Sequence, residues 1–121
     1  MNLPTVGLVL AINHSVRRDD EWFDEPDELD RVAAAIAAIE QIHDPVEAAA
    51  LLAFRLARAQ AFGEGNKRTA FLLARWVLDR NGEDGAALLP PHDSAVAELL
   101  VKAAGGQDVG AELVTLLTSR R

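Results

Sequence analysis

The sequence contains no cysteine, and this absence removes two ways of stabilising a small fold. Neither a disulfide framework nor a zinc site with thiolate ligands can form, so the fold has to depend on packing. The chain has 121 residues, of which 50% are hydrophobic, which is about the length of one domain and enough to bury a core. We therefore expect one globular domain over residues 1–121.

The sequence also lacks a hydrophobic run long enough to cross a bilayer, and it lacks a recognisable signal peptide. In the opening segment MNLPTVGLVLAINHSVRR the positive charges follow the apolar run instead of preceding it. We therefore predict a soluble cytoplasmic protein with no membrane partner.

Positive charge is scarce, because 12 Lys and Arg residues face 19 Asp and Glu residues, for a net charge of −7. Such a balance argues against direct binding to nucleic acid, which normally needs a basic surface. The two signs are nevertheless segregated. Acidic residues gather in RRDDEWFDEPDELD, whereas the middle third holds six cations, namely Arg55, Arg58, Lys67, Arg68, Arg75 and Arg80. This asymmetry permits an anion site inside an acidic protein.

Most of the chain has apolar residues at helical spacing, and it has no internal repeat or long linker. Helix starts are marked at HDPVE, where Asp44 is the expected N-cap, at DEPDE around Pro26, and at PPHDSAVAELL. The opening TVGLVLAINHSV suits either a strand or a helix, and a bundle favours the helix. We predict an all-α fold of about six helices, including helices at about 45–61, 66–81, 94–104 and 109–119.

The segment AQAFGEGNKRTAF joins two predicted helices and has the features of an anion site. Gly63 and Gly65 permit backbone conformations closed to other residues, just before a helix start whose N–H groups need partners. Lys67 and Arg68 follow in the first turn, where the helix dipole disfavours cations. Cations at this place indicate that a negative group lies between them. The residue types therefore predict a phosphate-bearing ligand.

Other residues of this segment support the same interpretation without deciding it. Asn66 is suited to cap the helix with its side-chain oxygen. Glu64 is the one carboxylate in the loop, and a phosphate site that uses Mg²⁺ needs a carboxylate near the metal. The segment is not a P-loop, because the serine or threonine after the lysine is absent and the glycine spacing differs. An ordinary turn with solvated cations remains the alternative.

The run Phe62-Gly63-Glu64-Gly65-Asn66-Lys67-Arg68-Thr69 resembles the core motif of Fic/Doc proteins, H-x-F-x-D/E-G/A-N-G/K-R. The lysine after the asparagine is most similar to the Doc (death-on-curing) branch. The segments WFDEPDELDRVAAAIA, VLDRNG and AAGGQDVGAELVTLL also look like their counterparts in the family. The resemblance implies a compact helical fold that uses ATP or a related nucleotide with Mg²⁺ to transfer a phosphoryl or nucleotidyl group to a hydroxyl of a target protein. Doc toxins phosphorylate elongation factor Tu and are neutralised by a small antitoxin, so two partner proteins are implied.

The resemblance also assigns a role to each residue of the loop. Glu64 would bind Mg²⁺, and Arg68 would act in catalysis by pairing with a terminal phosphate. Phe62 would be buried and would fix the loop. The remaining contacts to the nucleotide's phosphates would come from Gly63, Gly65, Asn66 and Lys67.

Gln60 occupies the place where the family has its histidine. That histidine is a general base, a task that needs a group able to exchange a proton near neutral pH. A glutamine amide cannot do this, although it can orient a hydroxyl, and phosphoryl transfer relies mainly on positioning and charge stabilisation. Of the other histidines only His14 has a position that leaves a substitute role open, and a structural role is favoured there.

Three hypotheses follow from this departure. The first is a Doc-type toxin in which Gln60 and Arg68 support a slow or altered transfer. The second is a catalytically inactive Fic-like module that binds a nucleotide or a protein. The third is a helical interaction domain with a purely structural loop.

The acidic segment RRDDEWFDEP lies where related proteins place a flap that holds a target segment. Trp22 and Phe23 in this segment either present an apolar surface to a partner or fold back onto the domain, and the sequence leaves both open. Phe71 and Trp76 are expected in the core.

Overall fold

The computed structural model describes residues 1–17 and 27–121. Over these two ranges the chain forms only helices, as the sequence predicts, and contains no strand. The helices are α1 (Val6–Val16), α2 (Leu29–Ala37), α3 (Pro45–Ala59), α4 (Asn66–Arg80), α5 (Gly85–Leu88), α6 (Ser94–Ala104) and α7 (Gly110–Thr118). In the ranges described, no helix is both long and apolar enough to cross a membrane.

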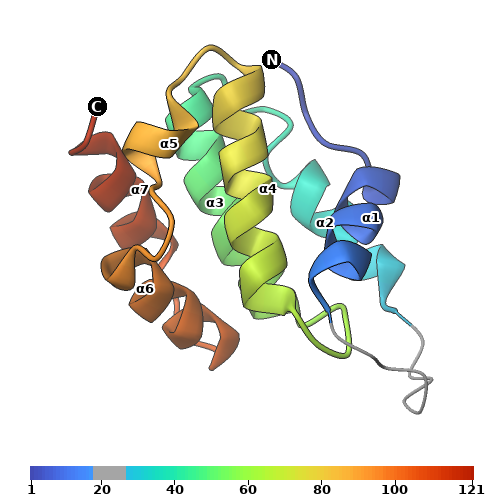
Figure 1. The fold of residues 1–121 in the computed structure, drawn as a ribbon. Helices are drawn as coiled ribbons and strands as arrows, with labels where there is room; N and C mark the ends of the chain where they lie inside the picture. The colour runs from blue at the N-terminus through green and yellow to red at the C-terminus, as the bar shows by residue number, and fades with distance from the viewer. Residues whose placement is uncertain (18–26) are drawn as a thin grey trace.

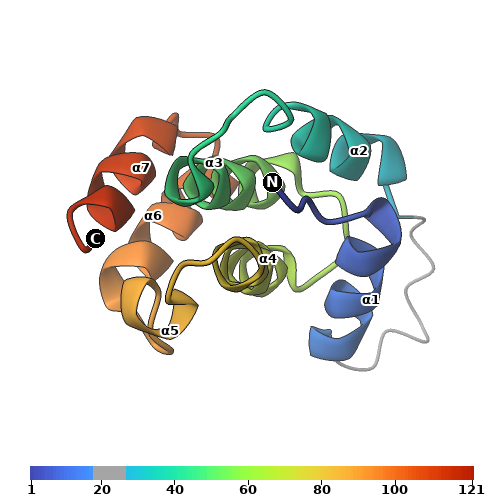
Figure 2. The same cartoon turned by 90° about the horizontal axis from the view of Figure 1, so that it is seen from above.

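Helices α3 and α4 lie side by side at the centre of the molecule (Figure 1). Seen from above, α1 and α2 cover one side of this pair, and α5, α6 and α7 cover the other (Figure 2). The segment 60–65 that joins α3 to α4 lies at one end of the bundle, and both chain termini lie at the opposite end (Figure 1). The predicted anion loop therefore lies at the end of the bundle away from both termini.

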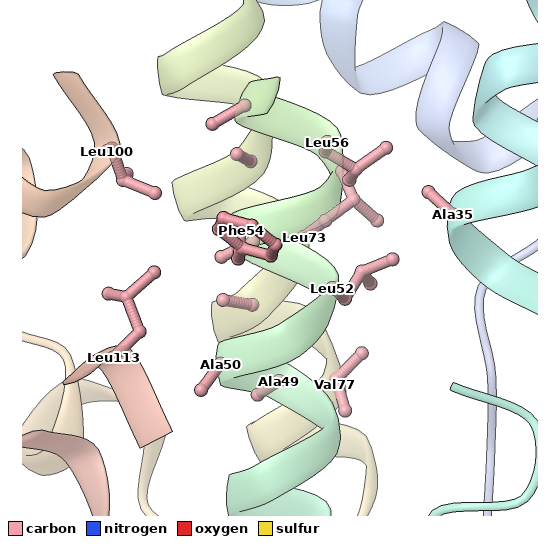
Figure 3. Packing of buried hydrophobic residues seen from close by; sticks show 14 of the residues in the cluster. Ala35, Ala49, Ala50, Leu52, Phe54, Leu56, Leu73, Val77, Leu100 and Leu113 are labelled. Carbon is pink, nitrogen blue, oxygen red and sulfur yellow. The ribbon is translucent and has the colours of Figure 1, made fainter. Parts of the chain in front are cut away.

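Helix α3 is buried on most of its circumference because most of its residues are apolar, chiefly alanine and leucine. On one side, Phe54 faces the part of the core that holds Leu113 of α7 (Figure 3). On the other side, Leu52 and Leu56 project toward Ala35 of α2 (Figure 3). The small residues of α3 let its neighbours approach closely, and they are Ala48, Ala49, Ala50, Ala53 and Ala57.

Three local features add to the sequence predictions or differ from them. The opening segment, which suits a strand or a helix, is the helix α1, and the Thr5 hydroxyl caps it by accepting from the backbone N–H of Leu8 at 3.1 Å. The predicted helix start at DEPDE is described only in part, because residues 24–26 lie outside the described ranges; α2 begins at Leu29, directly after this segment, and its N-cap Glu28 makes no side-chain cap bond. The four-residue helix α5 was not predicted, because one turn is too short to show a period.

The last two residues of the chain bind the N-caps of two helices. Arg120 pairs with Asp93, the N-cap of α6, and Arg121 donates to Asp44, the N-cap of α3, at 3.0 Å. The hydrogen bond from Arg121 lowers the pKa of the Asp44 carboxyl below its ordinary value of 3.8, and Arg120 does the same for Asp93. Each carboxylate therefore stabilises a helix start and holds the C-terminus in place.

We predict that acid weakens the fold through these two caps. A lowered folded-state pKa means that each carboxylate stabilises the fold fully above about pH 4 and loses this contribution as the pH falls through the lowered value. Urea unfolding measured between pH 7 and pH 2.5 should therefore show a loss of unfolding free energy that is smaller in the double variant Asp44→Asn, Asp93→Asn.

The cap of α6 is tested separately at pH 7. There Asp93→Ala should lower the free energy of unfolding by about 0.5–2 kcal/mol, and by more than Asp93→Asn does, because asparagine keeps the cap. Equal costs for the two Asp93 variants would show that the cap contributes nothing.

Candidate functional site

The loop between α3 and α4 turns through two residues with left-handed backbone. Gln60 ends α3 with φ 49° and ψ 45°, and Gly65 precedes α4 with φ 77°. Gly63 has no positive φ, and a Cβ built on it would meet nothing within 4 Å. Of the two glycines, only Gly65 thus adopts a backbone conformation that other residues avoid, and the second left-handed position is that of Gln60.

Asn66 closes the loop from the inside. It is buried at 8% exposure, its Oδ1 accepts from the N–H of Phe62 at 3.1 Å, and its Nδ2 donates to the carbonyl of Phe62 at 2.8 Å. The predicted capping role of Asn66 is wrong. Gly65 is the N-cap, because its carbonyl accepts the first helical bond, from Thr69 at 2.8 Å, and Asn66 is already the first residue of α4. Phe62 is buried, as the sequence predicts.

Asn13 of α1 also binds the loop through its side chain. Its side chain is fully buried, and its Nδ2 donates to the carbonyl of Glu64 at 2.9 Å and to the Thr69 hydroxyl at 3.2 Å. Its Oδ1 is buried without a hydrogen-bond partner in the described ranges. Sequence reasoning missed this residue. The sequence does contain a signal for it. Asn13 is a polar residue four positions after Val9, and these two are the buried residues of α1.

The start of α4 carries two cations. Among the described residues no side chain caps this helix, and Lys67 and Arg68 are exposed. Within residues 1–17 and 27–121, neither cation forms an ion pair with a carboxylate. The partial positive charge of the helix N-terminus adds to theirs. The loop therefore has the electrostatics of an anion site.

The loop also fits a magnesium–phosphate group in its choice of donors. Magnesium is usually held by one or two carboxylates together with phosphate oxygens, and not by an all-protein cage. Among the described residues no cluster of three or more His, Asp or Glu side chains could hold a metal. The loop supplies one such carboxylate, that of Glu64, which is exposed and lies a few residues before Lys67 and Arg68 in the chain.

Lys67 and Arg68 also line one wall of a pocket of about 630 Å³ between α4 and α6. Its other walls are mainly apolar, and its further lining residues are Phe71, Leu72, Arg75, Pro91, His92, Asp93, Ala97, Leu100 and Val101. A pocket lined by three cations, Lys67, Arg68 and Arg75, and otherwise mainly by apolar groups suits a phosphate group attached to a largely apolar group. Phe71 and Trp76 are partly buried against the core.

The histidines are distributed away from one another. His14 is exposed on α1, and its Nε2 lies 3.7 Å from the carboxylate of Asp27. His43 is exposed beside the cap of α3. His92, which the sequence placed only in a proline-rich loop, shares the pocket with Arg68, and nothing in the sequence spacing indicated this. Trp22 and Phe23 lie outside the described residues.

Comparison with known families adds to this geometry. The chain matches the Fic/DOC family over residues 7–78, which is more than half of its 121 residues. The chain belongs to the Fic/DOC family. The match covers α1 to α4 and thus every element that builds the loop. No curated protein and no solved structure matches the chain closely enough to show a relationship.

The two glycines of this Fic/DOC loop provide a matched test of its backbone. Gly65→Ala should lower the free energy of unfolding by at least 1 kcal/mol, because φ is 77° and the new Cβ would lie 3.2 Å from the Val16 side chain. Gly63→Ala should leave stability nearly unchanged. Chemical denaturation of both variants measures the difference, and similar losses for both would contradict the loop geometry described here.

The contact of Asn13 with the loop is tested by comparison with a second asparagine. Asn13→Ala should cost about 1–3 kcal/mol and should raise amide hydrogen exchange at residues 62–66, because the Glu64 carbonyl loses its buried donor. Asn81→Ala is the control, since Asn81 Nδ2 donates to the Val77 carbonyl at the other end of α4, at 2.8 Å. The control should leave exchange in the loop unchanged. Equal exchange in both variants would show that Asn13 does not hold the loop.

Proposed function

We propose that this Fic/DOC chain is a Doc-type toxin of a toxin–antitoxin module. It would transfer a phosphoryl or nucleotidyl group from ATP or a related nucleotide to a hydroxyl of a target protein. The observation that carries the proposal is the loop itself, where Lys67 and Arg68 lack carboxylate partners in the described chain beside an uncapped helix start.

In this proposal the chain's own groups hold the nucleotide's phosphates. The backbone N–H groups of the loop and of the first turn of α4 donate to phosphate oxygens, since they have no partner in the helix. Lys67 contributes a point charge, and Arg68 contributes a planar fork to the terminal phosphate. Glu64 holds the Mg²⁺, which when bound neutralises charge that develops on the phosphates.

Asn66 needs a separate account, because its side chain is already engaged with Phe62. Its part in phosphate binding would therefore come from its backbone N–H, and its amide would keep the loop in shape. Gly63 and Gly65 leave the backbone uncovered, so that a phosphate can approach the N–H groups.

The rate of such a transfer would be limited by Gln60, which occupies the place of a general base. Its amide cannot remove a proton from the attacking hydroxyl, and the loss of a general base typically costs about 10²–10⁴-fold in rate. Transfer of a phosphoryl group depends largely on positioning and charge stabilisation, which Lys67 and Arg68 supply. We therefore propose a slow enzyme in which Gln60 orients the target hydroxyl.

One observation favours a second candidate, a catalytically inactive Fic-like module that binds a nucleotide or a protein. The Gln60 Nε2 donates to the Ala57 carbonyl at 2.8 Å, and its Oε1 lies 3.5 Å from Asn66 Nδ2. Both polar ends of the side chain are thus directed to neighbouring protein groups, one on α3 and one on α4. In this arrangement the main role of Gln60 is to close the end of α3.

The partners in either case are proteins. As a toxin the chain would be neutralised by a small antitoxin protein and would act on a cytoplasmic target such as elongation factor Tu, without direct contact to nucleic acid or to a membrane. The net charge of −7 supports the absence of a nucleic-acid partner.

Nucleotide binding is tested by a thermal shift with ATP and Mg²⁺. Ligand at about 100 times its Kd should stabilise the protein by ~2.7 kcal/mol. Arg68→Ala should abolish most of the shift, whereas Arg80→Ala, which removes a cation at the far end of the same helix, should keep it. A shift that survives Arg68→Ala would place the nucleotide elsewhere, and no shift in any protein would refute the proposed site.

Activity is then tested with purified elongation factor Tu and ATP labelled at either the α- or the γ-phosphate. Transfer of the γ label indicates a kinase, and transfer of the α label indicates a nucleotidyl transferase. Gln60→His should raise the rate by about 10²-fold or more. Histidine tolerates the left-handed backbone of position 60 better than most residues do, so this variant should fold. Binding without transfer in the wild-type protein, together with transfer in Gln60→His, would establish the inactive module.

A further inference from the structure

A second basic pocket lies between α2 and α3, apart from the pocket that Lys67 and Arg68 line. Its volume is about 360 Å³, and its lining consists of three arginines and three alanines, namely Arg31, Arg55, Arg58, Ala34, Ala35 and Ala59. The two pockets share no residue. Nothing in the proposed chemistry of the α4 loop uses this second pocket.

Contacts other than ion pairs hold two of the three arginines in place. The Arg31 side chain donates from Nη1 to the carbonyl of Ala59 at 3.0 Å. The Arg58 guanidinium lies 5.7 Å from the centroid of the Phe54 ring, which is the distance of a cation–π contact. Arg55 precedes Arg58 by three residues on α3, so the two side chains lie on the same face of the helix.

These three cations have no carboxylate partner in the part of the chain that the structure describes. The helix dipole explains part of the arrangement, because Arg58 is in the last turn of α3, where a cation is favoured. The dipole acts only within about one turn, so it does not explain Arg55. It also does not explain why Arg31 of another helix joins the same pocket in a protein of net charge −7.

We propose that the pocket between α2 and α3 binds the oxyanion group, a carboxylate or a phosphate, of a small ligand whose apolar part lies on Ala34, Ala35 and Ala59. Each guanidinium presents several N–H donors in a plane that matches two oxygens of such a group. The cation–π contact and the Ala59 bond fix two of the three donors before the ligand binds, which reduces the entropy lost on binding. The alanine methyl groups make the rest of the pocket wall apolar.

The site is tested with pyrophosphate and citrate as probes, in isothermal titration at constant ionic strength set with sodium chloride. The protein used carries Lys67→Ala and Arg68→Ala, so that the loop of α4 does not contribute. We expect at least one of the two anions to bind. Adding Arg55→Ala or Arg58→Ala should weaken binding by about tenfold or more, because charge-assisted hydrogen bonds are lost. The anion that binds more tightly shows whether a phosphate or a carboxylate is the preferred source.

The chain offers a matched control in Arg80, whose guanidinium lies 5.6 Å from the Trp76 ring and lines neither pocket. Arg80→Ala removes the same charge and the same kind of aromatic contact, and it should leave the affinity for the anion unchanged. An equal loss in Arg80→Ala would show that only net charge matters and would overturn the proposal. Absence of binding by both anions would also overturn it.

Failure here is distinguishable from failure of the proposed loop function. If the wild-type protein binds the anions and the variant without Lys67 and Arg68 does not, the α4 loop is the anion site and the second pocket is not. Arg55→Gln guards against loss of folding, because it keeps the first three carbons of the side chain and a polar end while it removes the charged guanidinium. It should weaken anion binding as Arg55→Ala does, with an unchanged melting temperature in the absence of the anion.

Discussion

The constraint on which this structure depends is the apolar circumference of α3. A helix that is apolar on most of its circumference must be covered on those sides, and the face of α3 that carries Arg55 and Arg58 is exposed. Helix α4 covers one side, α2 another, and α6 and α7 a third (Figures 2 and 3). Because α4 packs along α3, the C-terminal end of α3 and the N-terminal end of α4 lie at the same end of the bundle. The loop between them is then the place where a ligand can reach two helix ends.

Two amide side chains, and not the glycines alone, give this loop its shape. Asn66 binds both backbone groups of Phe62, and Asn13 reaches the Glu64 carbonyl from α1. Asn13 leaves one buried oxygen without a partner in the described chain, which typically costs about 1–3 kcal/mol. The two bonds that Asn13 Nδ2 donates, to the Glu64 carbonyl and to the Thr69 hydroxyl, offset this cost and hold the loop against α1 and α4.

Much of the fold could be predicted from the sequence, because helical spacing and caps are local properties. Asp44 and the apolar residues of α3 indicate a helix and its start, and the cations after Gly65 indicate an anion site. The start of α2 is harder to predict, because its N-cap Glu28 makes no side-chain cap bond and its N–H donates instead to the distant Ala61 carbonyl at 2.7 Å. Asn13 was missed for a related reason.

Contacts over long sequence separations leave little trace in a single sequence. Asn13 and Glu64 are separated by 51 residues, and the three arginines of the second pocket come from two helices. Helical spacing places Arg55 and Arg58 on one face of α3 and Lys67 and Arg68 at the start of α4, but the sequence does not show that Arg31 of α2 lies beside Arg55 and Arg58. The packing of α2 against α3 brings these three arginines to one pocket.

The way in which the two ends of the chain are fastened has a practical consequence. The N–H of Asn2 donates to Asn81 Oδ1 at 2.6 Å, and Arg121 binds Asp44, so both ends are held at the end of the bundle opposite the loop (Figure 1). A tether, a fluorophore or a solid support attached at the N-terminus would therefore point away from the α3–α4 loop. Attachment at the C-terminus is less neutral, because it lies next to the side chain that supports the cap of α3. Immobilisation through the N-terminus is thus the format in which the loop stays open to solution with its supports undisturbed.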